Sequence, residues 1–167
     1  MNATESSVEA LSATMTSANS RFVFSNKELR DELSKLNADV MGSDTDPFYG
    51  APQVLIVLAD KSIGTYVYDG SLVMGNMMNA AEDLGISSCW IHRAKEVFAS
   101  EEGKLILRRL GISGDYEGIG NLVIGYDNGG KREKVPRKDN YVYWDGNLPY
   151  VSGGSQIIGI DGFGENK

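Results

Sequence analysis

Apolar side chains recur every three or four residues in several stretches of the chain, and this spacing is typical of helices that bury one face. The first such helix is predicted over residues 27–41, where Ser25 and Asn26 can cap its free N–H groups. Its buried stripe consists of Leu29, Leu33, Leu36 and Val40.

The most apolar helix is predicted in the middle of the chain, and either Asp69 or Ser71 can serve as its N-cap. Gly85 lies where a residue in the left-handed conformation commonly ends a helix. The apolar stripe consists of Val73, Met77, Ala80, Ala81 and Leu84, and Met74 and Met78 widen it. So wide an apolar face predicts a helix buried on most sides, by its own sheet, by a second subunit or by both.

Two shorter helices are predicted after the central one. Residues 94–98 form a single helical turn, and a further helix extends from its cap at Ser100 through Leu110. Gly111 closes that helix. Its charges match the helix dipole, with acidic residues in the first turn and basic residues in the last, namely Glu101, Glu102, Arg108 and Arg109.

Strands are predicted where β-branched, aromatic and small residues gather. Residues 53–59 and 118–126 are nearly continuous apolar runs, which is typical of strands covered on both faces. Shorter strand candidates are residues 21–24, 86–91, 141–144 and 156–160. The mixture predicts one α+β domain over residues 1–167, with atypical segments at residues 1–20 and 146–167.

Composition narrows the class of protein. The net charge of −7 and the pI near 4.7 argue against a nucleic-acid or anionic-membrane partner. No apolar run is long enough to span a bilayer, and residues 1–20 lack the basic start and apolar core of a secretory signal. The single cysteine, Cys89, excludes an internal disulfide framework and fits a reducing compartment. These features predict a soluble cytoplasmic protein.

Side chains that could take part in catalysis or metal binding lie at the end of the strand predicted over residues 86–91. Cys89 and His92 could be a nucleophile and a base, but residues three apart on a strand point to opposite faces, which favours a buried packing role for Cys89. The same pair is a weak metal signal without a second pair, so no metal is predicted. Gly118 and Gly120 precede a strand rather than a helix, which argues against a dinucleotide fingerprint.

Two loops carry further candidates. The aromatic tip over residues 48–52 is either a lid or a packing plug, and packing is favoured. Residues 131–138 concentrate positive charge on an acidic protein. They form either a solvated loop or a clamp for a small anion such as phosphate, and composition alone favours the solvated loop.

Four blocks, in their order and spacing, resemble the central and C-terminal parts of flavin-dependent nitroreductases. They are GAPQVLIVLADK, DGSLVMGNMMNAAEDLGISSCWIHRAKEVF, SEEGKLILRRLGISGDYEGIGNLVIGY and VPRKDNYVYW, and the resemblance covers roughly residues 48–144. It implies a central, mainly antiparallel sheet flanked by helices, with the long Met-rich helix at the interface of a homodimer. It also implies two FMN molecules at that interface, reduced by NADH or NADPH and oxidised by a small acceptor such as a nitroaromatic or quinone.

The resemblance also implies roles for individual residues. The segment along the flavin ring would be Trp90, Ile91, His92 and Arg93. Arg137 and Lys138 match a late basic pair that binds the FMN phosphate, which changes the interpretation of the basic loop. Phe48 and Tyr49 would lie on the substrate side of the pocket.

The chain departs from the resemblance at its start. Residues 1–20 contain no Arg-x-Ser-x-Arg motif of the kind that holds the flavin phosphate and ribityl chain, and the tail after Trp144 also differs. Asn19 and Arg21 are a possible remnant of a second flavin-binding loop. We therefore expect an N-terminal part that is lost or replaced. The alternative to an enzyme is a truncated relative with weak or no flavin binding, acting as a binding or structural protein.

Overall fold

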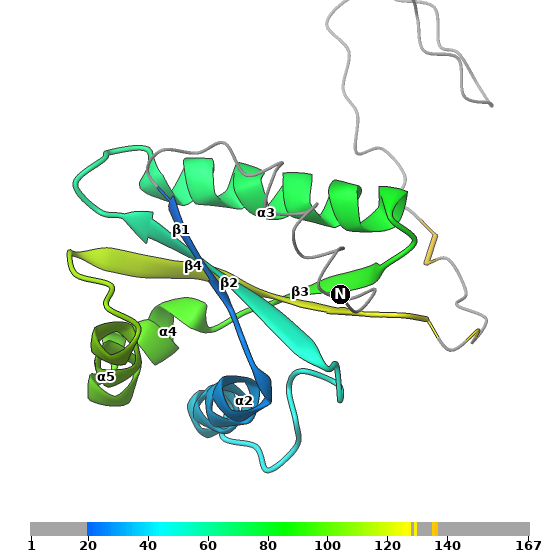
Figure 1. Cartoon of the computed structure of the whole chain (residues 1–167), viewed down its shortest axis with the longest axis horizontal. Coiled ribbons are helices and arrows are strands. Elements are labelled where there is room, and N and C mark those ends of the chain that lie inside the picture. The colour runs from blue at the N-terminus through cyan, green and yellow to red at the C-terminus, as the bar shows by residue number, and fades with distance from the viewer. Residues whose placement is uncertain (1–19, 128, 130–134, 137–167) are drawn as a thin grey trace, which may run out of the picture. The chain divides into compact units, whose positions relative to one another are not determined.

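A four-stranded sheet organises the fold, and its two most apolar strands lie in the middle. The strand order is β1 (Ser20–Phe24), β2 (Gln53–Asp60), β4 (Tyr116–Gly125) and β3 (Ser87–Ile91). Every pairing between them is antiparallel (Figure 1). The expected burial on both faces is confirmed for Val54 to Ala59 of β2 and for Gly120 to Ile124 of β4. Tyr126, which was included in the predicted buried run, lies beyond the end of β4 and is 63% exposed.

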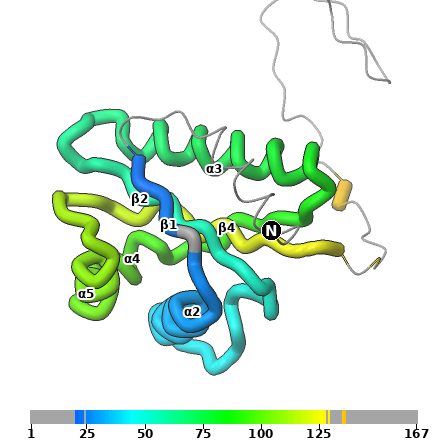
Figure 2. Tube along the Cα trace, in the orientation of Figure 1, coloured from blue at the N-terminus to red at the C-terminus, as the bar shows by residue number. Residues whose placement is uncertain are grey.

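Helices cover both faces of this sheet. In the computed structural model, α3 (Tyr66–Asp83) lies on one face, and α2 (Lys27–Met41), α4 (Ala94–Ala99) and α5 (Glu101–Arg109) lie on the other (Figures 1 and 2). Each face has its own hydrophobic core. The α+β class with a mainly antiparallel central sheet, expected from the sequence, is confirmed.

The helix ends follow the sequence signals in most cases. Asn26 Oδ1 accepts the Leu29 N–H at 2.9 Å, and Ser100 Oγ accepts the Gly103 N–H at 3.0 Å, so both predicted caps are confirmed. Gly85 has the expected positive φ of 69° directly after the C-cap of α3. These local interactions fix where each element begins and ends.

The predicted start of α3 is wrong by about one turn. The helix begins at Tyr66 after Thr65, which makes no side-chain cap hydrogen bond. Asp69 and Ser71 lie inside the helix instead. The Thr65 hydroxyl donates to Asp69 Oδ2 at 2.8 Å, and the Ser71 hydroxyl donates to the Val67 carbonyl at 2.7 Å. Polar residues that could cap a helix have bonded within its first turns, a competition that sequence alone does not resolve.

Two residues assigned to buried stripes are exposed. Val40 and Leu84 are each 43% exposed, because they lie in the last turn of α2 and at the end of α3, beyond the packed part of each helix. The methionines of α3 confirm one of the expected alternatives. Met74 and Met77 are fully buried against the chain's own sheet. The place of this helix at a dimer interface stays a prediction.

The structure describes residues 20–127, 129 and 135–136. The chain divides into two units, residues 1–130 and 131–167, and all the elements above belong to the first. The predicted strands at residues 141–144 and 156–160 lie outside the described residues, and the single domain over the whole chain stays a prediction. No helix in the described part of the chain is both long and apolar enough to cross a membrane.

Candidate functional site

The end of β3 is the first candidate site, because it combines an edge strand with aromatic and basic side chains. β3 pairs only with β4 among the described strands. Successive residues point to opposite faces, so Trp90 packs in the core under α3 and Ile91 packs in the core of the other face. His92 follows at the surface, exposed, and Arg93 is half-buried.

Trp90 is held in place by a close backbone approach. A Cβ atom on Gly120 would lie 2.3 Å from Trp90 Nε1 and 3.0 Å from Met74 Cε, so only glycine leaves room for the indole. The centroids of the Trp90 and His92 rings are 6.3 Å apart, with the ring planes tilted by 35°. Trp90 Nε1 is buried without a hydrogen-bond acceptor among the described residues. A buried donor in this state costs free energy unless a ligand or water accepts from it.

The chain makes a sharp corner directly after β3. Arg93 has φ 76° and ψ 9°, a left-handed conformation that is unusual for a residue other than glycine. The carbonyl of His92 points into the molecule, where Asn37 Nδ2 donates to it at 2.8 Å and Asn121 Nδ2 at 3.4 Å. Both asparagines are almost fully buried. They anchor this corner to α2 and β4.

Asn37 and Asn121 were missed by the sequence reasoning, although a signal was present. Asn37 lies four residues after Leu33 and one after Leu36, so a polar side chain interrupts the buried stripe of α2. Asn121 interrupts the apolar run of β4 in the same way. A polar residue at a core position needs a hydrogen-bond partner. The partner of both asparagines is the carbonyl oxygen of His92, at the end of β3.

Of the remaining flavin-contact candidates, the structure describes only Arg21. Arg21 lies on β1, the opposite edge strand from β3, with its guanidinium 5.8 Å from the centroid of the Tyr116 ring. Asn19, Arg137 and Lys138 lie outside the described residues. The roles assigned to these four residues stay predictions.

The two aromatic residues of the loop after α2 have opposite environments. Phe48 is fully buried in the core shared by α2, α4 and α5, in keeping with the packing interpretation of this loop. Tyr49 is 80% exposed and has a positive φ of 54°. Only Tyr49 therefore presents its side chain to a ligand in this structure.

Asp46 organises the backbone that carries Tyr49. Its carboxylate accepts the N–H groups of Phe48 at 2.9 Å and Gly50 at 2.8 Å, the Ser34 hydroxyl at 2.6 Å and a bond from Arg30. Burial is the largest single influence on this carboxyl and raises its pKa. The hydrogen bonds together outweigh burial and hold the pKa of Asp46 well below its usual range. The loop is thus built around one ionised carboxylate.

Cys89 corrects an expectation. The sequence favours a buried packing role for this thiol, but it is exposed on the edge strand β3. Its Sγ lies 3.9 Å from the Trp90 carbonyl, and no hydrogen bond joins it to His92. Among the described residues, no three His, Cys, Asp or Glu side chains are close enough together to hold a metal ion.

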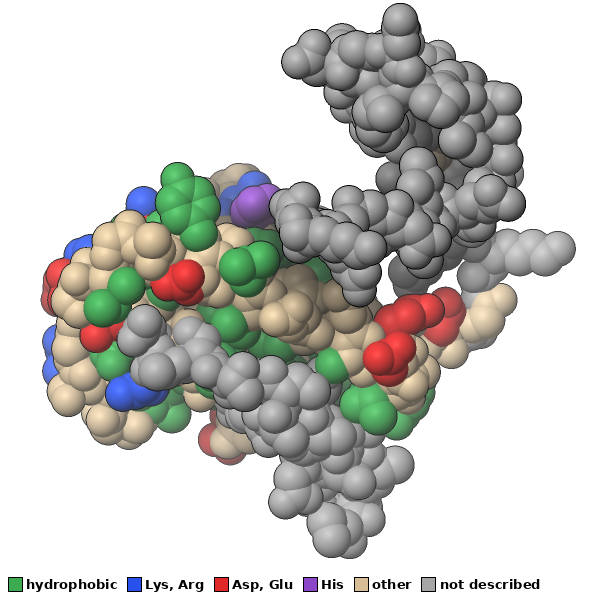
Figure 3. Space-filling view, turned by 90° about the horizontal axis from the view of Figure 1, so that it is seen from above, with side chains coloured by type: hydrophobic (Ala, Val, Ile, Leu, Met, Phe, Trp, Pro, Cys, Tyr) green, Lys and Arg blue, Asp and Glu red, His purple; other side chains and the backbone are tan. Residues whose placement is uncertain are grey.

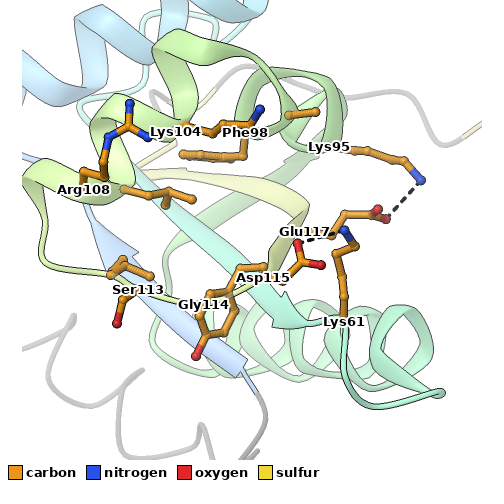
Figure 4. Close-up of a pocket in the computed structure, with 13 residues that line it drawn as sticks. Lys61, Lys95, Phe98, Lys104, Arg108, Ser113, Gly114, Asp115 and Glu117 are labelled. Carbon is orange, nitrogen blue, oxygen red and sulfur yellow. Dashed lines mark hydrogen bonds and ion pairs between the residues drawn. The ribbon is translucent and has the colours of Figure 1, made fainter.

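A second candidate site is a charged pocket of about 590 Å³ between the α4–α5 pair and the adjoining ends of β2 and β4. In Figure 4 the basic side chains on its right-hand side reach the acidic ones: Lys61 Nζ lies 2.8 Å from Asp115 Oδ1, and Lys95 Nζ lies 3.1 Å from Glu117 Oε1. These four charges cancel in pairs. Among the described basic residues that line the pocket, only Arg108 has no ion pair.

The comparisons with known proteins identify the fold. No protein-family model matches the chain, and no curated protein sequence matches it. A nitroreductase with bound FMN from Bacteroides fragilis superposes with a TM-score of 0.74 and 21% identity, over 87% of this chain and 89% of that one. A nitroreductase with bound FMN from Desulfitobacterium hafniense gives a TM-score of 0.70 and 24% identity, over 87% and 89% of the two chains.

A third solved structure extends the comparison to a ligand other than FMN. The nitroreductase CinD from Lactococcus lactis in complex with nicotinic acid has a TM-score of 0.65 and 13% identity, over 87% of this chain and 91% of that chain. Because these sequence identities are low, the similarity establishes the fold alone. The function has to be argued from the residues of the candidate site. The chain has the nitroreductase fold, and the resemblance seen in the sequence is confirmed at that level.

Proposed function

We propose that this chain is an FMN-dependent oxidoreductase that passes a hydride from NADH or NADPH through the flavin to a nitroaromatic or quinone acceptor. The observation that carries the proposal is the Trp90 indole N–H, which is buried at an edge strand without an acceptor among the described residues. A heteroaromatic ligand with ring nitrogens and carbonyls would supply that acceptor. The nitroreductases with bound FMN that share this fold support the choice of ligand.

The described residues fit the flavin ring better than its phosphate. The β3 end offers the Trp90 N–H, the exposed His92 ring and the half-buried Arg93 side chain, which are donors or cations suited to the polar edge of a heterocycle. For the phosphate we propose Arg137 and Lys138, and for a further flavin contact Asn19 and Arg21. When bound, FMN supplies the redox chemistry, and the protein supplies position and electrostatics.

The chain's own part in such a reaction is to orient ligands and to exclude water. Trp90, wedged over Gly120, gives the ring a fixed wall, and the corner at His92 fixes the backbone beside it. We propose that Tyr49 contacts the electron acceptor, because its exposed ring stands on a loop that Asp46 holds rigid. Phe48 then supports this loop from the core.

We also propose a homodimer, with the outer side of α3 as its contact surface. Tyr68 is 73% exposed and Leu72 is 69% exposed, and their spacing of four residues places them on one stripe. Figure 3 looks onto this side of the molecule and shows hydrophobic side chains exposed among polar ones. Large apolar side chains at such positions favour burial against a second copy.

The dimer is tested with a matched pair of substitutions. Leu72→Asp should shift the protein from dimer to monomer in sedimentation-velocity experiments. Leu105→Asp, on a different helix and 57% exposed, should leave the dimer intact. A monomeric parent chain, or equal behaviour of the two variants, would contradict the assignment of this surface.

The flavin assignment is tested on the purified full-length chain. We expect yellow protein, or uptake of added FMN, and bleaching of the flavin band when NADH or NADPH is added without oxygen. Replacing Arg137 and Lys138 together by Ala should weaken FMN retention by more than tenfold, since hydrogen bonds between charged groups contribute about 1.5–3 kcal/mol each. Replacing Lys61 and Arg108 together by Ala removes the same charge from the charged pocket and should change nothing.

Colourless protein that takes up no FMN would instead support the alternative, a relative that keeps the fold as a binding or structural protein. The absence of the Arg-x-Ser-x-Arg motif is the feature that favours this alternative. Equal FMN retention by the parent and the Arg137/Lys138 variant would remove the phosphate assignment while leaving the ring site in place.

A further inference from the structure

Two buried side-chain amides from distant parts of the chain meet at one backbone carbonyl. Asn37 on α2 is 55 residues from His92 in sequence, and its Nδ2 donates to the His92 oxygen at 2.8 Å. Asn121 on β4 donates to the same oxygen at 3.4 Å. The two side chains are 1% and 2% exposed, so the fold buries both amides there. A carbonyl oxygen has two lone pairs and can accept both donors.

The direction of this carbonyl determines the direction of the next N–H group. The structure contains no cis peptide bond among its described residues, so the His92–Arg93 peptide is trans and its N–H points opposite to its C=O. Because the carbonyl points inward, the Arg93 N–H points outward. This N–H makes no hydrogen bond to another described residue. The β3 end therefore presents a backbone donor to its surroundings.

The peptide is held in its less favourable orientation. Arg93 has φ 76°, where a side chain with a Cβ crowds the backbone. Rotating this one peptide by half a turn would bring Arg93 to a negative φ, out of the left-handed region in which its Cβ crowds the backbone. The same rotation would turn the His92 carbonyl outward and the Arg93 N–H inward. The hydrogen bonds from Asn37 and Asn121 oppose that rotation, since it would break both.

We infer that Asn37, assisted by Asn121, is a positioning residue that keeps the His92–Arg93 peptide turned so that the site offers a donor instead of an acceptor. The inference rests on the proposed function for the identity of the ligand, the acceptor edge of the flavin ring. The orientation of the peptide itself does not depend on that ligand. Neither asparagine touches the ligand, since both are buried behind the backbone.

The first arm of the test uses ligand-free protein, so its result is independent of flavin binding. Crystal structures of Asn37→Ala and Asn37→Leu should show the His92 carbonyl turned outward and a negative φ at Arg93. Asn37→Leu keeps the branched shape of the side chain but carries no donor, which separates the hydrogen bond from packing. Ser34→Ala is the matched control: it removes a hydrogen bond from the same helix to Asp46 and should leave the peptide unchanged. An unturned peptide in both Asn37 variants would overturn the inference.

The second arm measures FMN binding by the quenching of flavin fluorescence. Asn37→Ala should raise the dissociation constant about tenfold, the value of roughly one hydrogen bond, and Ser34→Ala should leave it unchanged. In an Arg93→Gly background the positive φ carries no penalty, so adding Asn37→Ala should raise the constant less than about threefold. A tenfold effect in both backgrounds would contradict a role through the conformation of residue 93.

The two arms distinguish the failure of the inference from the failure of the proposed function. If the parent chain binds no FMN, the flavin assignment fails, while the ligand-free structures still decide whether Asn37 sets the peptide. If FMN binds tightly and the peptide does not turn in the Asn37 variants, the flavin assignment survives and the positioning role is rejected.

Discussion

The end of β3 and the charged pocket differ in how well their polar groups are satisfied. The pocket is the more obvious candidate by volume and charge, yet Lys61 and Lys95 are already paired with carboxylates inside it. The β3 end has few charges, but Trp90 Nε1 is buried there without a partner among the described residues. Partnerless buried groups cost free energy and therefore indicate a ligand more strongly than a count of charges does.

The two regions also differ in rigidity. The β3 end is defined by close backbone approaches, since a Cβ on Gly118 would lie 2.4 Å from the Ala94 carbonyl oxygen and one on Gly120 would lie 2.3 Å from Trp90 Nε1. The pocket is bordered by long side chains, whose Lys61 and Asp115 members are 39% and 76% exposed. A preorganised site orients a ligand at a smaller entropic cost than long exposed side chains, which must first be ordered.

The largest effect is expected for Gly120→Ala. The added methyl group collides with Trp90 and Met74, so we expect a loss of about 3 kcal/mol in the free energy of unfolding, together with displacement of the indole. Urea unfolding and tryptophan fluorescence measure the two effects. Gly64→Ala is the control, because a Cβ there meets no atom within 4 Å and stability should change by less than about 0.5 kcal/mol. Equal midpoints for both variants would show that the β3 end is not tightly packed.

Replacing Asp46 measures how much a carboxylate with several hydrogen bonds contributes to the free energy of unfolding. The ion pairs of the charged pocket are the comparison. Asp46→Ala removes four hydrogen bonds, and we expect a loss of about 2 kcal/mol at neutral pH after allowance for its partial exposure. The folded-state pKa of Asp46 lies below its unfolded value near 3.9, so its contribution is fully present above pH 5 and is lost as pH falls through that range. Urea midpoints measured from pH 7 to pH 2 should therefore fall less steeply for Asp46→Ala than for the parent.

Trp90→Phe separates the packing of the indole from its unpartnered N–H. Phenylalanine keeps an aromatic wall over Gly120 but removes the buried donor, so the free energy of unfolding of ligand-free protein should stay within about 1 kcal/mol of the parent. FMN affinity should fall about tenfold if the flavin accepts from this N–H. Thermal unfolding and flavin titration give the two values. Unchanged FMN affinity would remove the indole N–H from the flavin site.

The smallest effects are expected in the charged pocket. Lys61→Ala and Lys95→Ala each break one surface ion pair, and such pairs contribute little to stability. The urea midpoint and the FMN affinity of both variants should equal those of the parent within experimental error. A clear loss of FMN affinity in either variant would mean that the pocket, and not the β3 end alone, takes part in flavin binding.

The elements could be predicted because their signals are local. The stripe of α2, the apolar runs of β2 and β4, and the caps at Asn26 and Ser100 depend on neighbours within a few residues. The start of α3 could not be predicted, because Thr65, Asp69 and Ser71 offered competing local bonds whose balance depends on packing. The outward stripe with Tyr68 and Leu72 was missed for a similar reason, since the methionines face the sheet instead.

Only part of the candidate site could be predicted from the sequence. Trp90, His92 and Arg93 follow one another in the chain, so their clustering at a strand end was visible in the sequence. The resemblance to nitroreductases suggested FMN as the ligand, which the residues alone did not suggest. Neither source could show that Phe48 is buried and Tyr49 exposed, because adjacent residues share the same local pattern and differ only in what packs on them.

The sequence by itself determined the order of helices and strands and the α+β class, and it indicated the strand end proposed as the flavin site, since periodicity, capping and clustered side chains are properties of short segments. Only the tertiary structure decided which direction the His92–Arg93 peptide faces, because the amides that hold it come from residues 55 and 29 positions away. Contacts of that kind depend on how strands are ordered in the sheet and on which helix covers which face, and no local pattern encodes them.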